Sequence, residues 1–144
     1  MEHETMGRVL TEATIENLED LWGVKRGRLA ADQVRRITVT DALVDTGATT
    51  LALPTRLIKQ LGLAKAYERQ ATSSRGVGLV AVYEAVRLTL LDRFCTVDVI
   101  EVPDDVPVLI GQIPLEMLDL VVDLPGRRLT GNPAHGYEQI LELY

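Results

Sequence analysis

Short β-branched segments, separated by glycine and proline turns, occupy most of this chain. Such segments are typical of strands, and the turn residues between them limit where each strand can run. The pattern predicts strands at residues 6–15, 34–45, 92–102, 108–111, 121–123 and 128–131, and two extended arms within 67–91. The two arms flank residues 73–78, where Gly76 and Gly78 permit the positive φ angles of a tight hairpin tip.

Two stretches have the spacing of short helices. Pro54 stands at the start of the first, which places Leu57, Ile58 and Leu61 on one face and ends at Gly62. The second is predicted to begin at Pro114. Residues 16–33 contain two glycines and mixed polarity, so we predict a loop excursion there with no more than one helical turn.

Many short strands and only one or two short helices predict an all-β fold, a closed or partly closed barrel. The 144 residues are the size of one domain, with a core at about 6–133 and a C-terminal tail at 134–144. Residues 42–62 and 107–120 share an order of apolar strand, glycine turn, proline and helix. This likeness leaves open whether the chain contains an internal duplication.

Charge and composition argue against several kinds of partner. The chain has 21 acidic and 15 basic residues, a net charge of −6, and its basic clusters are short, so nucleic acid is not an expected partner. No apolar run approaches the roughly 20 residues of a membrane span, and the first residues lack the apolar centre of a signal peptide. We therefore expect no membrane partner and a cytoplasmic location. Alternation with Val97 predicts that Cys95 is a buried thiol.

The titratable side chains offer few candidate sites. His3 and His135 stand alone and are expected on the surface, so the sequence predicts no metal site. No phosphate-binding or dinucleotide-binding loop is present, and no organic cofactor is predicted. The acidic pair at 104–105 is expected in a solvated turn, and Asp119 and Asp123 are expected as exposed charges flanking a helix.

Asp45 is the remaining candidate. It follows the apolar run at 42–44, in a position where an ionised aspartate is seldom found without a partner. Thr46 and Gly47 come next, and Asp, Thr and Gly together also suit an ordinary turn, so the bare triplet is only weakly specific. The strand before it, the glycine-containing hairpin and the second apolar strand ending in glycine favour a chemical role.

These three elements together resemble a retropepsin-like aspartic protease, a family that includes retroviral proteases and single-domain bacterial members. The resemblance lies in "LVDTGA" at 43–48, in "SSRGVG" at 73–78, which corresponds to the family's flap hairpin, and in "LIGQIPLEMLD" at 109–119. Their order and spacing cover about residues 37–130. The ending at 121–136 is similar to the close of bacterial members.

The resemblance implies peptide hydrolysis by two aspartates about 3 Å apart that share one proton, without a metal or organic cofactor. One carboxylate takes a proton from water and the other protonates the substrate carbonyl. Only one Asp-Thr-Gly is present, so the resemblance implies a two-fold homodimer with Asp45 of each subunit at the axis. It also implies activity at acidic to near-neutral pH, lost when both aspartates are ionised.

Further roles follow from the same resemblance. Gly47 would let backbone approach the carboxylates, the Thr46 hydroxyl would anchor the two loops, and Ala48 and Thr49 would line the cleft floor. The flap would close over an extended peptide and contact it with backbone groups. The flap residues concerned are Arg75, Gly76, Val77 and Gly78.

The sequence therefore predicts an aspartic endopeptidase that acts on extended peptide segments. It departs from retroviral members at Thr49 and Thr50, where they usually carry acidic residues, and at Gln112, where they carry an arginine. One alternative is an inactive binding or dimerisation module with the same barrel, although such a module would have no use for a buried like-charge pair. Another is a β-barrel in which the triplet occurs by coincidence.

Overall fold

The computed structural model describes residues 8–143, which form nine strands, three α-helices and two short 3₁₀ helices. The strands are β1 (Leu10–Asn17), β2 (Arg36–Val44), β3 (Leu51–Pro54), β4 (Lys65–Ser73), β5 (Gly76–Leu90), β6 (Arg93–Val102), β7 (Leu109–Ile110), β8 (Leu120–Asp123) and β9 (Arg128–Gly131). The helices are α1 (Leu18–Lys25), η2 (Ala31–Gln33), α2 (Thr55–Leu61), α3 (Gln112–Met117) and η3 (Pro133–His135).

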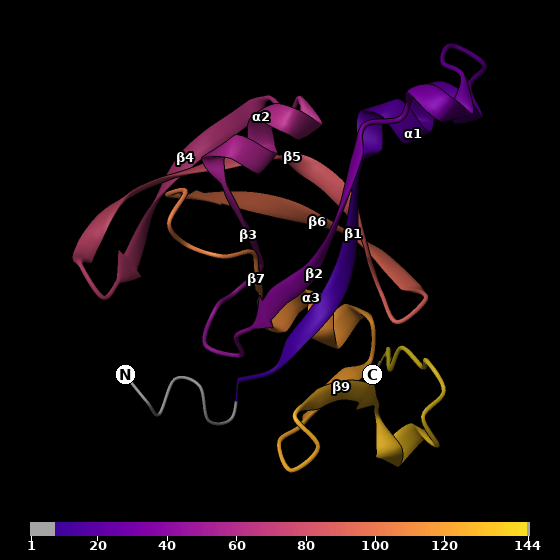
Figure 1. Ribbon diagram of the computed structural model, residues 1–144, viewed down its shortest axis with the longest axis vertical. Helices are drawn as coiled ribbons and strands as arrows, with labels where there is room; N and C mark the ends of the chain where they lie inside the picture. The colour runs from indigo at the N-terminus through magenta and orange to yellow at the C-terminus, as the bar shows by residue number, and fades with distance from the viewer. Residues whose placement is uncertain (1–7, 144) are drawn as a thin grey trace.

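Hydrogen bonding closes six of the strands into a barrel, as the all-β prediction required. The seven-stranded sheet has the order β1-β2-β7-β3-β6-β5-β4, and residues 14–17 of β1 also pair with residues 86–89 of β5. The ring therefore runs from β1 through β2, β7, β3, β6 and β5 back to β1. The first half of β5 instead pairs with β4, and this hairpin extends beyond the barrel (Figure 1).

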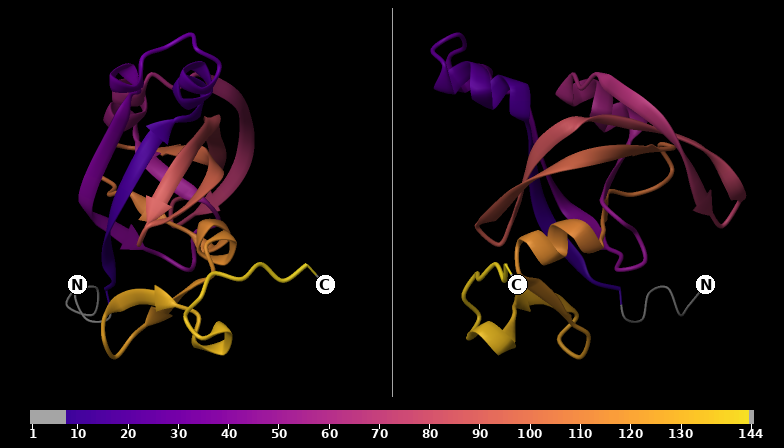
Figure 2. Two further views of the ribbon diagram at one scale, coloured as in Figure 1. Left: turned by 90° about the vertical axis from the view of Figure 1, so that its right-hand side faces the viewer. Right: turned by 180° about the vertical axis from the view of Figure 1, so that it is seen from behind.

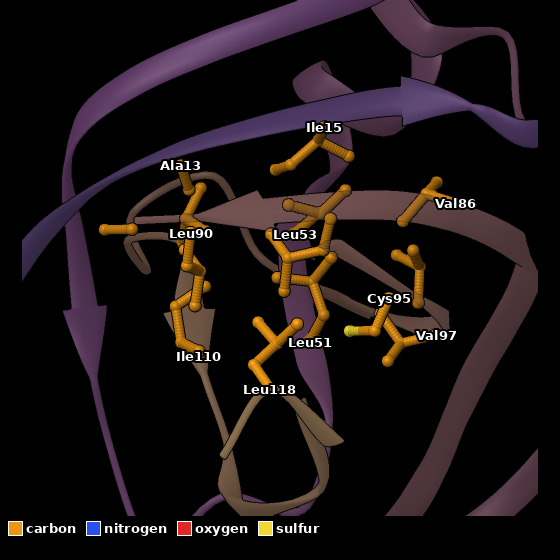
Figure 3. Packing of buried hydrophobic residues seen from close by; sticks show 14 of the residues in the cluster. Ala13, Ile15, Leu51, Leu53, Val86, Leu90, Cys95, Val97, Ile110 and Leu118 are labelled. Atoms are coloured by element: carbon orange, nitrogen blue, oxygen red, sulfur yellow. The ribbon is translucent and has the colours of Figure 1, made fainter. Parts of the chain in front are cut away.

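Alternating apolar side chains fill the barrel interior. On β6, Cys95, Val97 and Val99 are buried while the residues between them face outward, and all four residues of β3 are buried. The packing of these side chains is shown in Figure 3. The burial predicted for Cys95 is confirmed, and desolvation raises the pKa of its thiol to about 11.

The segment at 16–33 differs from its prediction, because it contains a helix of two turns. α1 begins after Asn17, whose side chain accepts a hydrogen bond from the Asp20 amide (2.9 Å) and donates one to the Leu61 carbonyl (2.9 Å). Asp20 is buried and pairs with Arg35. The segment projects from one end of the barrel (Figures 1 and 2). The predicted loop was wrong, and the described chain has three α-helices rather than one or two.

The other predicted elements lie close to their expected positions. α2 follows Pro54 and ends at Gly62, which has a left-handed φ of 66°, as predicted. β1 begins at Leu10. Residues 6 and 7 of the predicted strand lie outside the described residues, and so does His3. None of the helices within residues 8–143 has the length and hydrophobicity needed to cross a membrane.

Below the barrel, β8 and β9 form a separate two-stranded sheet against which the C-terminal tail lies (Figure 1). Asp119 holds this tail, because its carboxylate accepts hydrogen bonds from His135 Nδ1 (2.6 Å), Asn132 Nδ2 (3.2 Å) and the Ile140 amide (3.0 Å). Arg93 adds a hydrogen bond to the Tyr137 carbonyl (2.6 Å).

The contacts of Asp119 correct two expectations from the sequence. The side chains of His135 and Asp119 are only 15% and 10% exposed, so neither is the free surface group that was expected. His135 Nε2 also approaches Glu142 (3.0 Å). The hydrogen bond to Asp119 raises the pKa of His135, and the same bond lowers the pKa of Asp119.

Candidate active site

Asp45 lies at the carboxyl end of β2, where the chain leaves the barrel wall. β2 runs parallel to β7, with Val44 opposite Ile110, and the Asp45 amide donates to the Ile110 carbonyl (2.9 Å). The Ala48 amide then donates to the Asp45 carbonyl (3.0 Å), which closes a turn. These two hydrogen bonds fix the backbone of Asp45, and the residue is half-buried.

The carboxylate of Asp45 is held from one side only. Its Oδ1 atom accepts a hydrogen bond from the Gly47 amide (2.9 Å), and Oδ2 has no hydrogen bond to any residue in 8–143. A Cβ atom on Gly47 would lie 3.2 Å from Oδ1, tighter than usual for such a contact. Thr46 and Gly47 are exposed. The Asp45 side chain therefore makes the local hydrogen bond expected of an Asp-Thr-Gly turn, and its Oδ2 atom remains available.

Gly111 allows the loop after Asp45 to wrap around the end of β7. The Gly111 amide donates to Thr50 O (2.9 Å), and the next two amides, Gln112 and Ile113, donate to Ala48 O (2.9 Å) and Thr49 O (2.8 Å). A Cβ atom on Gly111 would lie 2.5 Å from Thr50 O and 2.7 Å from Ala48 O, so this position has no room for a side chain.

The same contacts explain why α3 starts earlier than predicted. The amides of Gln112 and Ile113 have partners in the loop, so the helix begins at Gln112, two residues before Pro114. Sequence reasoning identified the apolar strand and its glycine but assigned no role to Gly111 itself. The signal was present in the sequence, because a glycine that directly follows a buried strand often marks close backbone contact.

The β4–β5 hairpin corresponds to the predicted flap. Ser73 pairs with Gly76, so the turn consists of residues 74 and 75, and the Arg75 amide donates to Ser73 Oγ (3.1 Å). Gly76 has a φ of 103°, as its predicted place in the tip requires. Gly78 instead lies in β5 opposite Ala71 with an ordinary φ, so its predicted turn role was wrong. All four predicted flap residues, 75–78, are exposed.

A pocket of about 520 Å³ lies between this hairpin and the barrel. Thr49 and Thr50 contribute to it from the Asp45 loop, β4, β5 and β6 contribute side chains, and Ile113 contributes from α3. Of the predicted site residues, Thr49 lines this pocket, whereas 45–48 and 75–78 do not. The structure therefore joins the candidate catalytic loop to a pocket through two threonines.

Several pocket residues were not identified from the sequence, among them Tyr67, Arg69, Asp98 and Ile113. Alternation along each strand indicates which side chains share a face, but only the register between strands shows which of them meet. Within residues 8–143, no three His, Cys, Asp or Glu side chains gather where they could hold a metal ion.

Comparison with protein-family profiles gives a match that covers more than half of the chain. A family profile described as aspartyl protease matches residues 33–117. The matched stretch begins just before β2, includes the Asp45 loop and the β4–β5 hairpin, and ends with α3. A search of curated proteins found no match.

Proposed function

Because the chain belongs to the aspartyl protease family, we propose that it is an aspartic endopeptidase that hydrolyses peptide bonds in extended peptide segments. The geometry of Asp45 carries the proposal. Its carboxylate follows a buried strand, accepts one bond from Gly47 and has a second oxygen without a partner in residues 8–143. A carboxylate placed in this way can accept a proton from water and later return it.

The second carboxylate comes from another copy of the chain. Metal-free hydrolysis of this kind needs one ionised and one protonated carboxyl group, and the matched stretch contains a single Asp-Thr-Gly. We place the exposed Thr46 and Gly47 of each subunit at a two-fold axis, where an isologous contact brings the two Asp45 side chains together. The Thr46 hydroxyls then anchor one loop to the other across this axis.

The paired aspartates would share one proton, since two like charges so close cannot both be ionised at low cost. The ionised Asp45 takes a proton from water, the water oxygen attacks the carbonyl carbon, and the other Asp45 protonates the carbonyl oxygen. The Asp45 that took the proton from water then gives it to the leaving nitrogen as the C–N bond breaks. One hydroxyl of the tetrahedral intermediate returns its proton to the other Asp45, which restores the shared proton. Each Gly47 amide holds its carboxylate in place through this cycle.

The remaining predicted residues would bind the peptide. Ala48 and Thr49 form the cleft floor beside the aspartates, and Thr49 already lines the pocket. The flap residues 75–78, which are exposed in the free chain, would close over the substrate and exclude water. An extended peptide suits this place, because strand-like backbone groups of the flap can hydrogen-bond to it.

The proposal is tested by incubating the protein with a mixed peptide library at several pH values. The wild type is expected to cleave peptides, an Asp45→Asn variant to cleave none, and an Asp41→Asn variant to cleave at the wild-type rate. Asp41 is a suitable control because it lies in β2 and is exposed. Equal cleavage by Asp45→Asn would contradict the proposal. Peptide binding by a wild type that does not cleave would indicate the inactive module instead.

A further inference from the structure

Two oppositely charged side chains line the pocket under the hairpin. The pocket has an apolar wall that includes Val80, Val82 and Ile100, and its charged residues are Arg69 on β4 and Asp98 on β6. Both of these residues are exposed. Neither side chain has a hydrogen bond or ion pair with any residue in 8–143.

Strand register places the two charges on opposite sides of an apolar row. Tyr67 pairs with Val82, and Val82 pairs with Ile100, so these three side chains lie side by side on one face. Arg69 lies two residues beyond Tyr67 toward the hairpin tip, and Asp98 lies two residues before Ile100. Each charge is therefore about 7 Å along the strands from the row, in opposite directions.

Asp98 is the charge nearer the Asp45 loop. The Thr50 hydroxyl donates to the Asp98 carbonyl (3.2 Å), and Thr50 belongs to the loop that starts at Asp45. Arg69, opposite Val80 in the β4–β5 register, belongs to the arm of the flap. The pocket thus has a negative side toward the barrel and a positive side toward the hairpin.

We propose that these two residues select the substrate by charge, an inference that rests on the endopeptidase function proposed above. Asp98 binds a basic side chain of the peptide, and Arg69 binds an acidic one. The apolar row between them contacts the aliphatic parts of both side chains. The preferred substrates are therefore peptides that carry a basic and an acidic residue close to the cleaved bond, rather than purely apolar segments.

The physical basis is the change in surroundings when a peptide binds. In the free chain both charges are solvated and need no partner. A bound peptide displaces water from the pocket, which strengthens each ion pair and penalises a substrate that leaves either charge unpaired. Charge recognition of this kind acts mainly on specificity, and it weakens as salt is added.

Cleavage of designed peptides tests the inference. Fluorogenic eight-residue peptides share an apolar centre and carry Lys on one flank and Glu on the other, in both orders, with matched peptides in which Gln replaces Lys or Glu. We expect Asp98→Asn to lower kcat/KM by about three- to tenfold for Lys-containing peptides and to leave their Gln versions unchanged. Arg69→Gln is expected to do the same for Glu. Asp98→Arg is expected to reverse the preference.

Two matched variants serve as controls. Asp92→Asn removes a charge from the turn before β6, and Arg28→Gln removes one from the loop after α1. Neither residue lines the pocket. Both should keep the wild-type charge preference. Because Arg69 and Asp98 are exposed, their replacement should not impair folding, which urea unfolding of each variant checks. Equal cleavage of charged and Gln peptides by the wild type would overturn the inference and leave the endopeptidase function standing.

Peptide binding separates this inference from the proposed catalysis. Fluorescein-labelled versions of the same peptides are added to the Asp45→Asn variant, and binding is followed by fluorescence anisotropy. Charged peptides should bind about three- to tenfold more tightly than their Gln versions, and Asp98→Asn should remove the Lys preference. Such binding without cleavage by the wild type would support charge selection and contradict the endopeptidase. Absence of both cleavage and charge-dependent binding would overturn both proposals.

Discussion

Replacing Gly111 with alanine should disturb the candidate site more than the small size of the added methyl group suggests. The added Cβ would lie 2.5 Å from the Thr50 carbonyl oxygen and 2.7 Å from that of Ala48. Both contacts are backbone atoms of the loop after Asp45, so no flexible side chain can move aside. The loop must shift, and its three hydrogen bonds to the amides of residues 111–113 must lengthen or break.

The expected loss of stability has two parts. Overpacking of a closed site costs about 1–3 kcal/mol, and the loss of one or two hydrogen bonds adds about 1 kcal/mol each. Together they lower the free energy of unfolding by about 2–5 kcal/mol. With a urea slope of about 2 kcal/mol per M, the unfolding midpoint falls by about 1–2.5 M. A typical domain keeps a folded state after such a loss, so activity can also be measured.

Urea unfolding of wild type and Gly111→Ala measures this loss, with Gly78→Ala as the matched control. A Cβ on Gly78 would meet no atom within 4 Å, and the φ of Gly78 is ordinary, so this variant should stay within about 0.5 kcal/mol of wild type. Peptide cleavage by folded Gly111→Ala should fall, since the loop positions Asp45. If Gly111→Ala were as stable as Gly78→Ala and as active as the wild type, the close packing of β7 inside the loop would be refuted.

Three further predictions concern titratable groups. Asp20→Ala should lower the free energy of unfolding by about 1–3 kcal/mol at pH 7, because three N–H donors of Arg35 lose their acceptor. The Arg35 side chain lowers the pKa of Asp20, so this stabilisation is lost as pH falls through the lowered pKa, and an equal effect at pH 7 and pH 3 would contradict the pairing. Burial raises the pKa of Cys95 to about 11, so a thiol reagent at pH 8 should label the folded protein far more slowly than the urea-unfolded protein, and similar rates would be unexpected. The hydrogen bond to Asp119 raises the pKa of His135, and the ion pair therefore stabilises the C-terminal tail below that pKa and weakens as pH rises through it. Hydrogen exchange in the tail should be faster in His135→Gln than in wild type at pH 5.5, with a smaller difference at pH 9, and an unchanged difference would argue against the charged pair.

Local patterns in the sequence predicted most of the barrel. Alternation placed Cys95 and Val97 on the buried face of β6, and both are buried. Pro54 and Gly62 marked the ends of α2, because proline suits a helix start and glycine adopts the left-handed conformation that ends one. Each of these features depends on residues near one another in the chain, which is why the sequence alone was sufficient.

Contacts between distant residues account for the features that were missed. α1 is fixed by the Asn17 bond to Leu61, 44 residues away, and by the pair of Asp20 with Arg35. Neither contact leaves a local pattern, and Gly23 inside the helix pointed to a loop. Asp119 was likewise expected to be exposed, because nothing in the sequence connects it with His135.

The candidate site was predicted in part for the same reason. The residues around Asp45 form a compact motif, and their turn could be expected from their types alone. The pocket depends on the register of β4, β5 and β6, which brings Arg69 and Asp98 to one face. A shift of one residue in any of these strands would turn their side chains to the opposite face. Such a register cannot be fixed from one sequence.

The most direct test of the two-aspartate mechanism is the activity of mixed subunits. Wild type and Asp45→Asn are unfolded together in varied proportions, refolded, and assayed at constant total protein. If each active site needs Asp45 from two subunits, activity follows the square of the wild-type fraction, and an equal mixture retains about a quarter of the wild-type rate. A linear dependence, with about half the rate in that mixture, would show that one chain suffices and would contradict the shared site.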